Sequence, residues 1–491
     1  MPPIAAGALV FGASAAVLVL EILAVRLLAP FLGVTLETTT GIIGTVLAGI
    51  ALGTWLGGRL ADRVEPARLL GPLLVAGGAL ALAVIPIVGV AANIGLSPDP
   101  LGILVFAGLA FFAPAAVLSA ISPTVVKMQL RDLEETGSIV GRYSALGTTG
   151  AIIGTFVTGF VLVAALPTRP IIIVLGLILV VVGLAVTATL GRTRGPGPAI
   201  LALALLGLSV VWVVAGPDRC ERESAYFCIS VEEDGGRVSG RLLLMDSLRH
   251  AYVDLDDPSY LRFSYTSLLG DIADALAPQG EPIDALHVGG GGFTLPRYIE
   301  ATRPESYNRV LELDPVVLQT AREELGLTTG PDLEVALGDG RLSLQDEPAD
   351  SYDLVIGDAF AGPAVPWHLT TTEFLTDVQR VLRDDGVYAA NIIDYQPLDL
   401  ARAELATLGA VFEHIAVVGA PGRLSGQTGG NIILVASDTP IDAAAIADEI
   451  EARGAGDIAE ADPAALVAFI DGAPVLTDDY APADQLLTRP T

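Results

Sequence analysis

Two patterns of hydrophobic and polar residues meet near residue 217 of the 491-residue chain. Before this point, long apolar stretches are separated by short loops. A membrane-spanning helix needs about 20 mostly apolar residues. Seven stretches of the chain qualify, the last of them being the shortest: 4–32, 40–58, 69–92, 101–126, 143–166, 171–190 and 199–215. The pattern therefore predicts a multi-span α-helical membrane domain over residues 1–216.

Positively charged residues gather in every second loop of this region, and this distribution predicts the orientation of the domain in the membrane. Cytoplasmic loops carry an excess of Lys and Arg. These residues gather in the loops that follow the second, fourth and sixth stretches: Arg59, Arg63, Arg68, Lys127, Arg131, Arg142, Arg192 and Arg194. The N-terminus is therefore expected in the cytoplasm, and seven spans would place the remainder of the chain outside. The multi-pass protein would sit in the cell membrane, in contact with the lipid bilayer.

Four single residues in and after the spans have two interpretations each. Cys220 and Cys228 lie eight apart, directly after the seventh stretch. They form either a local disulfide, as an oxidising compartment would permit, or a pair of unlinked thiols. Glu21 and Arg26 are charged residues within the first stretch, where charge is costly and is a functional hypothesis by default. A structural ion pair between them is the favoured interpretation, and a polar ligand site is the alternative.

Composition narrows the classes of function. Apolar residues make up 52% of the chain, yet the formal net charge is −29, because the carboxylates are concentrated in the second half. A nucleic-acid-binding protein needs a basic surface, so this class is excluded. Lys127 is the only lysine. A carboxylate-rich, lysine-poor surface suits high salt, which screens its self-repulsion. A halophilic source is the favoured explanation, and codon bias is the alternative.

The second half alternates between strand-like and helix-like segments. Residues 217–265 are interpreted as a linker and a small β region, followed by a helical period over 260–277 and a Rossmann-like domain over 266–491. Strands are predicted at 285–288, 309–313, 333–337, 352–356, 387–393, 412–418 and 431–435. Helices are predicted at 295–301, 315–325 and 371–382, the last followed by Gly386 beyond its end. This alternation indicates a doubly wound α/β sheet of the methyltransferase type.

Candidate binding residues follow the carboxyl ends of the predicted strands, where such sheets bind ligands. A glycine cluster follows the first strand: Gly289, Gly290, Gly291 and Gly292. Glu312 ends the second strand, 21 residues after Gly291, a spacing suited to an acid that accepts hydrogen bonds from ribose hydroxyls. Asp339 and Asp358 end the third and fourth. The cluster lacks the GxGxxG spacing of a dinucleotide site, which favours an adenosyl-sulfonium ligand.

These motifs resemble the spermidine synthase (polyamine aminopropyltransferase) family, and the whole chain resembles its membrane-fused members. The resemblance rests on the glycine cluster, on Glu312, and on four segments: Gly338-Asp339-Gly340, Asp358-Ala359-Phe360-Ala361-Gly362-Pro363, Phe263-Ser264-Tyr265 and Thr477-Asp478-Asp479-Tyr480. It implies that Gly340 and the glycine cluster help bind the donor. It also implies that Glu312 binds the ribose, Asp339 binds the adenine amine, and Asp358 deprotonates the attacking amine. The implied reaction moves an aminopropyl group from decarboxylated S-adenosylmethionine, a donor substrate rather than a resident cofactor, to a polyamine such as putrescine.

The chain departs from the family pattern at three polar positions. The family's Asp within the glycine cluster is replaced by Gly292 or Phe293, its His-Glu pair after Tyr265 by Thr266 and Ser267, and its second loop acid by Ala361. A cation is expensive to bury without carboxylates. Methyl transfer from intact S-adenosylmethionine is therefore a rival function. A non-catalytic adenosyl-ligand or polyamine sensor, coupled to a transporter-like membrane half, is another.

Further residues are candidates for the substrate pocket. Tyr265, His368, Tyr395, Asp478 and Asp479 are assigned to substrate binding, and Asp394 is a possible replacement acid. His287 lies inside a predicted buried strand and is interpreted as a core residue. The four histidines show no metal-ligand spacing, so no metal site is predicted. A homodimer is an open alternative to a monomer.

Overall fold

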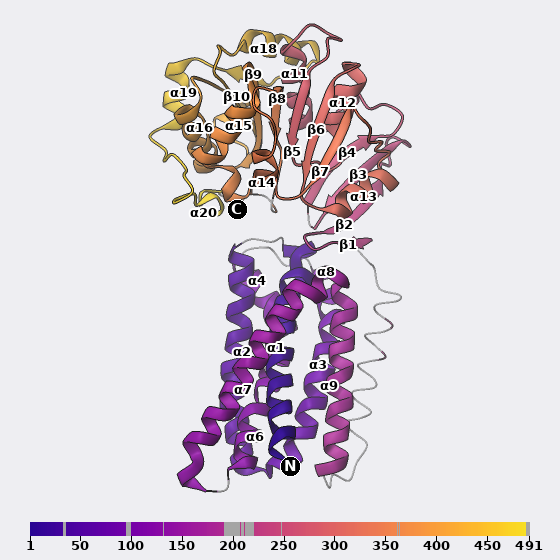
Figure 1. The fold of residues 1–491 in the computed structure, drawn as a ribbon, viewed down its shortest axis with the longest axis vertical. Coiled ribbons are helices and arrows are strands. Elements are labelled where there is room, and N and C mark those ends of the chain that lie inside the picture. The colour runs from indigo at the N-terminus through magenta and orange to yellow at the C-terminus, as the bar shows by residue number, and fades with distance from the viewer. Residues whose placement is uncertain are drawn as a thin grey trace. The chain divides into compact units, whose positions relative to one another are not determined.

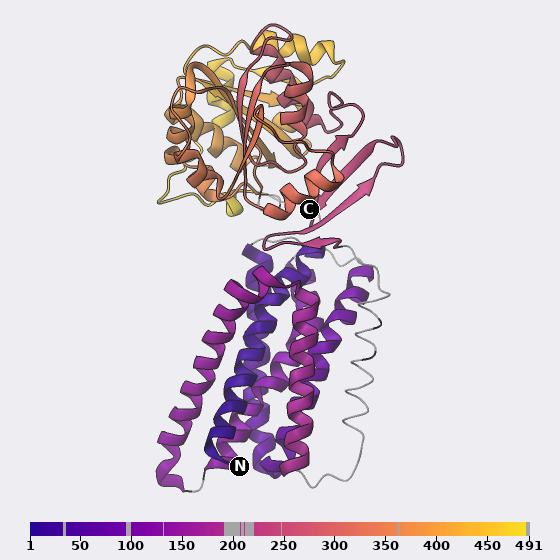
Figure 2. The same cartoon turned by 45° about the vertical axis from the view of Figure 1, so that its right-hand side comes forward.

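The computed structural model describes residues 1–32, 36–94, 100–130, 132–190, 207, 211, 220–246, 248–360, 362 and 364–487. Within these residues the chain divides into two compact units, Met1–Cys228 and Ile229–Thr491. The first is helical and the second is built around β-sheets (Figures 1 and 2). The first unit is the helical domain and the second is the α/β domain.

The helical domain has six helices that are long and apolar enough to cross a membrane. Three are continuous: α1 (Pro3–Leu32), α2 (Leu36–Arg63) and α9 (Thr168–Leu190). A fourth, α3 (Pro66–Ile94), is long and apolar enough to cross a membrane over Pro66–Ala91. The remaining two contain a π-helical turn, a feature often found at functional sites. The first of these consists of α4 (Pro100–Ala107), η1 (Gly108–Phe112), α5 (Ala113–Ser119) and α6 (Ile121–Gln129). The second consists of α7 (Thr136–Val157), η3 (Thr158–Leu162) and α8 (Val163–Ala165). The 3₁₀ turn η2 (Leu133–Glu135) precedes α7.

Small residues bring these helices into close contact. The most extensive pairs are α3 with α9, α1 with α7 and α2 with α5. A Cβ atom on Gly53 would lie 1.9 Å from the carbonyl oxygen of Ala116, so only glycine permits this approach of α2 to α5. Six of the seven predicted spans are thus present as long helices. The seventh prediction, 199–215, lies outside the described residues apart from two isolated positions.

The pairing expected within the first helix is not formed, because Arg26 has a different partner. Its guanidinium binds Glu223 at 3.0 Å and also donates to the carbonyl oxygen of Ala225 at 3.0 Å. Glu223 lies in the short strand β1 (Arg222–Glu223) and accepts a further hydrogen bond from the backbone N–H of Thr168 at 2.8 Å. The interpretation of Glu21 and Arg26 as an ion pair is therefore wrong. Nearby, Cys220 and Cys228 form a disulfide, which decides between the two alternatives left open above.

The α/β domain begins with a small antiparallel sheet. Its strands β2 (Cys228–Glu233), β3 (Gly240–Met245) and β4 (Leu248–Asp254) pair in sequence order. This confirms that a small β region lies within residues 217–265. The helix that follows, α11 (Ser264–Ala275), is shorter than its prediction because residues 260–263 form a loop before it.

The main sheet has eight strands in the order β12-β10-β11-β9-β8-β5-β6-β7. The five strands from β9 to β7 are parallel, whereas β11, β10 and β12 pair antiparallel at the other end. The strands are β5 (Asp284–Val288), β6 (Tyr307–Glu312), β7 (Leu333–Leu337), β8 (Tyr352–Gly357), β9 (Leu382–Asp394), β10 (His414–Gly419), β11 (Gly430–Ser437) and β12 (Ile458–Glu460). The predicted α/β fold is confirmed, and the antiparallel end and β12 are additions to it.

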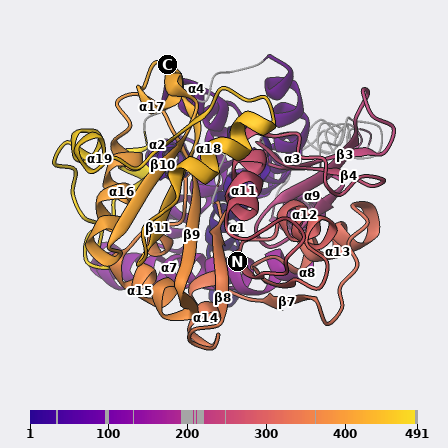
Figure 3. The same ribbon diagram turned by 90° about the horizontal axis from the view of Figure 1, so that it is seen from above.

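Helices cover both faces of this sheet (Figure 3). Successive side chains of a strand point to opposite faces, and β5 shows this in its packing. Ala285 joins a core formed with α11, α12 (Thr294–Thr302) and α18 (Ala443–Ala452), whereas Leu286 and Val288 join a core with α15 (Thr372–Val381) and α16 (Asp399–Val411). The remaining helices are α13 (Pro315–Glu324), α14 (Gly340–Gln345), η4 (Trp367–Leu369), α17 (Pro421–Leu424), α19 (Pro463–Ile470) and α20 (Ala483–Leu486).

One predicted helix end is wrong. Strand β9 begins at Leu382, directly after α15, so Gly386 lies within the strand and not in a loop beyond the helix. A Cβ atom on Gly386 would lie 3.0 Å from the carbonyl oxygens of Arg383 and Tyr352. The close approach of the β8 backbone therefore explains this glycine better than helix termination does.

Candidate active site

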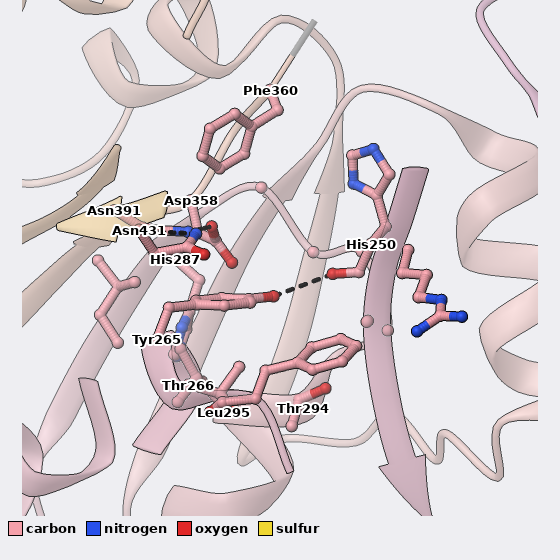
Figure 4. A pocket seen from close by; sticks show the side chains of 18 of the residues that line it. His250, Tyr265, Thr266, His287, Thr294, Leu295, Asp358, Phe360, Asn391 and Asn431 are labelled. Atoms are coloured by element: carbon pink, nitrogen blue, oxygen red, sulfur yellow. Dashed lines mark hydrogen bonds between the residues drawn. The ribbon is translucent and has the colours of Figure 1, made fainter. Parts of the chain in front are cut away.

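A cavity of about 290 Å³ opens at the carboxyl ends of the central parallel strands. Such edges are where doubly wound sheets bind ligands. Its walls come from β4, the start of α11, the loop after β5 and the ends of β8, β9 and β11 (Figure 4). Its lining includes Arg249, His250, Tyr265, His287, Gly289, Gly290, Gly291, Gly292, Asp358, Phe360, Asn391 and Asn431.

Asp358 is the one carboxylate among the described residues that line this cavity. It follows β8, and its backbone N–H donates to the carbonyl oxygen of Val288 at 2.9 Å, which ties it to the end of β5. Its Oδ1 accepts a hydrogen bond from the side-chain amide of Asn391 at 2.8 Å. Burial raises the pKa of Asp358 to about 6, against the opposing effect of the Asn391 hydrogen bond. This carboxyl group can therefore exchange a proton near neutral pH, as a general base must.

Aromatic rings flank Asp358. The rings of Phe360 and Tyr265 lie on either side of the carboxylate in the view of Figure 4. The Tyr265 hydroxyl donates to the carbonyl oxygen of His250 at 2.9 Å, which fixes the ring between α11 and β4. Burial and the nearby Asp358 charge raise the pKa of Tyr265 well above its usual value, so the phenol is protonated at neutral pH.

Two histidines line the cavity in their neutral form. Burial lowers the pKa of both His250 and His287 to about 4. The Nε2 atom of His287 lies 3.0 Å from Oδ1 of Asn308, so the ring is hydrogen-bonded inside the sheet. His287 thus has the partner expected of a core residue, although it also contacts the cavity.

The glycine cluster is held by Glu312. Its Oε2 accepts hydrogen bonds from the backbone N–H groups of Gly290 at 2.9 Å and Gly291 at 3.3 Å, and its Oε1 accepts one from Asp314 at 2.7 Å. Burial raises the pKa of Glu312, and these N–H groups oppose the shift. Gly289 has φ +101°, and a Cβ there would lie 2.4 Å from the carbonyl oxygen of Asp358. The loop between Asp358 and Glu312 therefore has room only for glycine at position 289.

No carboxylate replaces the one that the family resemblance would place in this loop. A Cβ atom on Gly292 would lie 2.6 Å from Cβ of Ala251, so strand β4 leaves no room for a side chain. Phe293 is fully buried with φ 55°, and its ring lies against Gly290. The loss of the family's carboxylate is thus a consequence of the packing of β4 against the glycine loop.

Asp339 belongs to a second polar group, which does not line the cavity. Its Oδ1 caps α14 by accepting from the N–H groups of Arg341 at 3.0 Å and Leu342 at 3.1 Å. Its Oδ2 lies 3.2 Å from Nε2 of His368. Arg341 in turn binds both carboxylate oxygens of Asp478 at 2.7 Å. The structure therefore brings Asp339, His368 and Asp478 together around Arg341.

The remaining candidates lie elsewhere. A Cβ on Gly340 would lie 3.0 Å from Val288, so this glycine lets α14 approach β5. The ring of Tyr395 covers Gly429 and does not line the cavity, and neither does Asp479. Buried Asp394 accepts from the N–H groups of Tyr395 at 2.7 Å and Ala401 at 2.9 Å, so it shapes the start of α16.

Sequence reasoning missed the two asparagines that connect to Asp358. Asn391 lies near the end of β9, and its Oδ1 accepts from Nδ2 of Asn431 in β11 at 3.0 Å. Both belong to segments that were predicted as strands, but a polar residue in an apolar strand was the sole available signal. In the part of the chain that the structure describes, no group of three or more His, Cys, Asp or Glu could hold a metal ion.

Comparisons with known proteins bear on the α/β domain. No family profile matches the chain. Polyamine aminopropyltransferase of Vibrio vulnificus is 32% identical over 155 residues, which is 31% of this chain and 48% of the relative. The protein of the same name from Chromobacterium violaceum is 28% identical over 164 residues, covering 33% and 60%. The chain is thus similar in sequence to polyamine aminopropyltransferases. It spans about half the length of these curated relatives.

Spermidine synthase relatives also occur among solved structures. A probable spermidine synthase from Corynebacterium glutamicum is 31% identical, with a TM-score of 0.49, covering 54% of this chain and 96% of that one. A zebrafish (Danio rerio) protein named eEF1A lysine and N-terminal methyltransferase is 30% identical over 129 residues, which is 24% of this chain and 19% of that protein. The sequence similarity therefore extends from spermidine synthases to methyltransferases.

Proposed function

We propose that this protein is a membrane-anchored aminopropyltransferase that moves an aminopropyl group from decarboxylated S-adenosylmethionine to a polyamine such as putrescine. The observation that carries the proposal is Asp358, a carboxylate with a pKa of about 6 beside a glycine loop that Glu312 holds. The names of the curated relatives support the same reaction. The six long apolar helices support anchoring in the cell membrane.

In the proposed reaction, the acceptor amine is bound as an ammonium ion and gives its proton to Asp358. The free nitrogen attacks the carbon next to the sulfonium. A C–N bond forms as the C–S bond breaks, and the electron pair of that bond stays on sulfur, which leaves as a neutral thioether. Glu312, which is itself held by the N–H groups of the loop, would position the adenosyl part of the donor. Asp339 would contact the adenine amine in addition to capping the start of α14.

Methyl transfer is the second candidate, and one observation favours it. An aminopropyl donor and a diamine together carry several positive charges, whereas Asp358 is the one carboxylate among the described lining residues. Stranding a cation without a carboxylate is costly. Intact S-adenosylmethionine carries its own carboxylate and would need fewer acids from the protein.

The test uses the full chain in detergent at high salt, with putrescine and each donor in turn. Aminopropyl transfer releases methylthioadenosine and methyl transfer releases S-adenosylhomocysteine, which mass spectrometry separates. We expect methylthioadenosine. Asp358→Asn should lower the rate by about 10²-fold or more, the usual scale for a positioned base, whereas exposed Asp332→Asn should leave it unchanged. Donor binding without either product would refute the transferase and favour a sensor.

A further inference from the structure

The helical domain contains a second cavity, of about 360 Å³, between five of its helices. Residues of α1, α2, α5, α6 and α7 line it, and its polar groups are six hydroxyls: Ser14, Thr54, Ser119, Ser122, Ser144 and Thr148. The rest of the lining is apolar or glycine, and none of the described residues that line it is charged. We call this cavity the hydroxyl groove.

The six hydroxyls differ from other hydroxyls of the same domain. Thr45, Thr124 and Thr149 each donate to the carbonyl oxygen one turn earlier in their own helix, at 2.7–2.8 Å. None of the six has a hydrogen-bond partner within the described part of the chain. An unpaired polar group costs free energy in a hydrocarbon environment. A groove with six of them is therefore suited to polar contents.

Glu21 adds a carboxyl group on the face of α1 that lines the groove, one turn beyond Leu18. Ser14 and Leu18 line the groove from α1, and Glu21 follows them at the i+7 and i+3 positions, on the same face of the helix. Its Oε2 is buried and has no hydrogen-bond partner in the structure. Arg26, its expected partner, is bound to Glu223 instead. An intramembrane carboxylate without a partner is a functional-site hypothesis by default.

We propose that the hydroxyl groove, together with Glu21, binds an organic amine cation within the membrane. Hydroxyl and carboxylate oxygens accept hydrogen bonds from ammonium N–H groups, and Glu21 would supply the opposite charge when it is ionised beside a bound cation. Anions are disfavoured because the described lining of the groove contains no cationic side chain. The volume falls in the range typical of small-molecule sites. The proposal rests on the membrane location proposed above but not on the transfer reaction, so either can fail alone.

Cysteine protection tests this site without interference from the α/β domain. The chain has two cysteines, which form a disulfide, so Ser144→Cys introduces one free thiol. The full-length variant, in lipid nanodiscs without reductant, is treated with a water-soluble maleimide. Putrescine is the probe ligand. At about ten times its Kd, occupancy of the groove should slow labelling by about tenfold.

Matched variants assign the protection to the groove. In the Ser144→Cys background, Glu21→Gln should remove the protection, and Glu21→Asp should keep most of it, which shows that the fold survives. Asp358→Asn should keep it fully. Thr149→Cys, next to the groove but with its native hydroxyl bonded to Ala145, should show none. An unreactive Ser144→Cys, protection that survives Glu21→Gln, or protection lost in Asp358→Asn would each overturn the proposal.

Discussion

The side-chain amide of Asn391 donates a 2.8 Å hydrogen bond to Oδ1 of Asp358 and itself accepts one from Asn431 at 3.0 Å. The three residues come from the ends of β8, β9 and β11, which are neighbours in the sheet. The register of β9 with β11 pairs Asn431 with Ile393, two residues from Asn391. Strand pairing therefore fixes the hydrogen-bond partners of the candidate base.

This chain of hydrogen bonds predicts the pH dependence of the reaction. Asp358 accepts a proton only when ionised, so the rate should fall about tenfold per pH unit below a pKa near 6. Asn391 stabilises the charged form, so Asn391→Ala should raise the pKa. A hydrogen bond to a charged group contributes about 1.5–3 kcal/mol, which corresponds to a shift of one unit or more. The acid limb of the kcat/KM profile should move to higher pH by that amount.

Asn431→Ala is the control for this measurement. Asn431 contacts Asn391 but not Asp358 in the hydrogen-bond chain, so its loss should shift the acid limb by less. An acid limb that stays in place in Asn391→Ala would show that Asp358 does not control the rate.

The sequence predicted the parallel strands well because each is a short apolar run that ends at Gly or an acid. Its failures have physical reasons. Gly386 is a close-packing residue within β9, and a helix-ending glycine looks the same in one sequence. Glu21 and Arg26 have a spacing that suits an ion pair, but the partner of Arg26 is 197 residues away. The pairing of Asp339 with His368 likewise depends on the tertiary fold.

Some residues of the candidate site could likewise be predicted from the sequence, and others could not. The glycine cluster, Glu312 and Asp358 follow strands and carry recognisable spacing. Asn391 and Asn431 have no such spacing, since their contact exists only when β9 and β11 pair. Tyr395 follows a predicted strand, as the other candidates do, but its ring lies against Gly429 and away from the cavity.

Buried Glu404 predicts a stability that falls as pH rises. It lies in α16, its Oε1 has no hydrogen-bond partner in the structure, and burial with the nearby Asp394 charge raises its pKa from 4.5 to about 8. Between these values the unfolded chain releases a proton that the folded domain retains, so the free energy of unfolding decreases with pH. Glu404→Gln removes this penalty and should stabilise the domain at pH 9 but have little effect at pH 4.

Hydrogen exchange of peptides covering Asp399–Val411 can measure this effect in the full chain. Slower exchange in Glu404→Gln at high pH, with no change at low pH after correction for intrinsic rates, is the expected result. Asp399→Asn is the control, because this residue is exposed at the start of the same helix. Equal protection of wild type and Glu404→Gln at pH 9 would contradict the raised pKa.

The disulfide predicts which side of the membrane holds the α/β domain. If the N-terminus is cytoplasmic, as the charge pattern predicts, and each of the six long apolar helices crosses the membrane, the chain would return to the cytoplasmic side at Leu190. Disulfides persist in oxidising compartments and are rare in the cytosol, so Cys220–Cys228 favours a further crossing before residue 220. The predicted span at 199–215 would supply it. We therefore expect the domain outside, although its proposed donor is made in the cytosol.

Thiol labelling of intact cells measures this directly, because the chain has no cysteines besides these two. A membrane-impermeant maleimide should label intact cells only after reduction with an impermeant phosphine. Labelling that requires lysis would place the domain in the cytoplasm and would leave the disulfide without an oxidising environment. If intact cells are labelled only after reduction, the donor must instead reach the outer side of the membrane. In that case the hydroxyl groove, which we propose to bind amine cations within the membrane, could deliver the acceptor but would leave the supply of the donor to another protein.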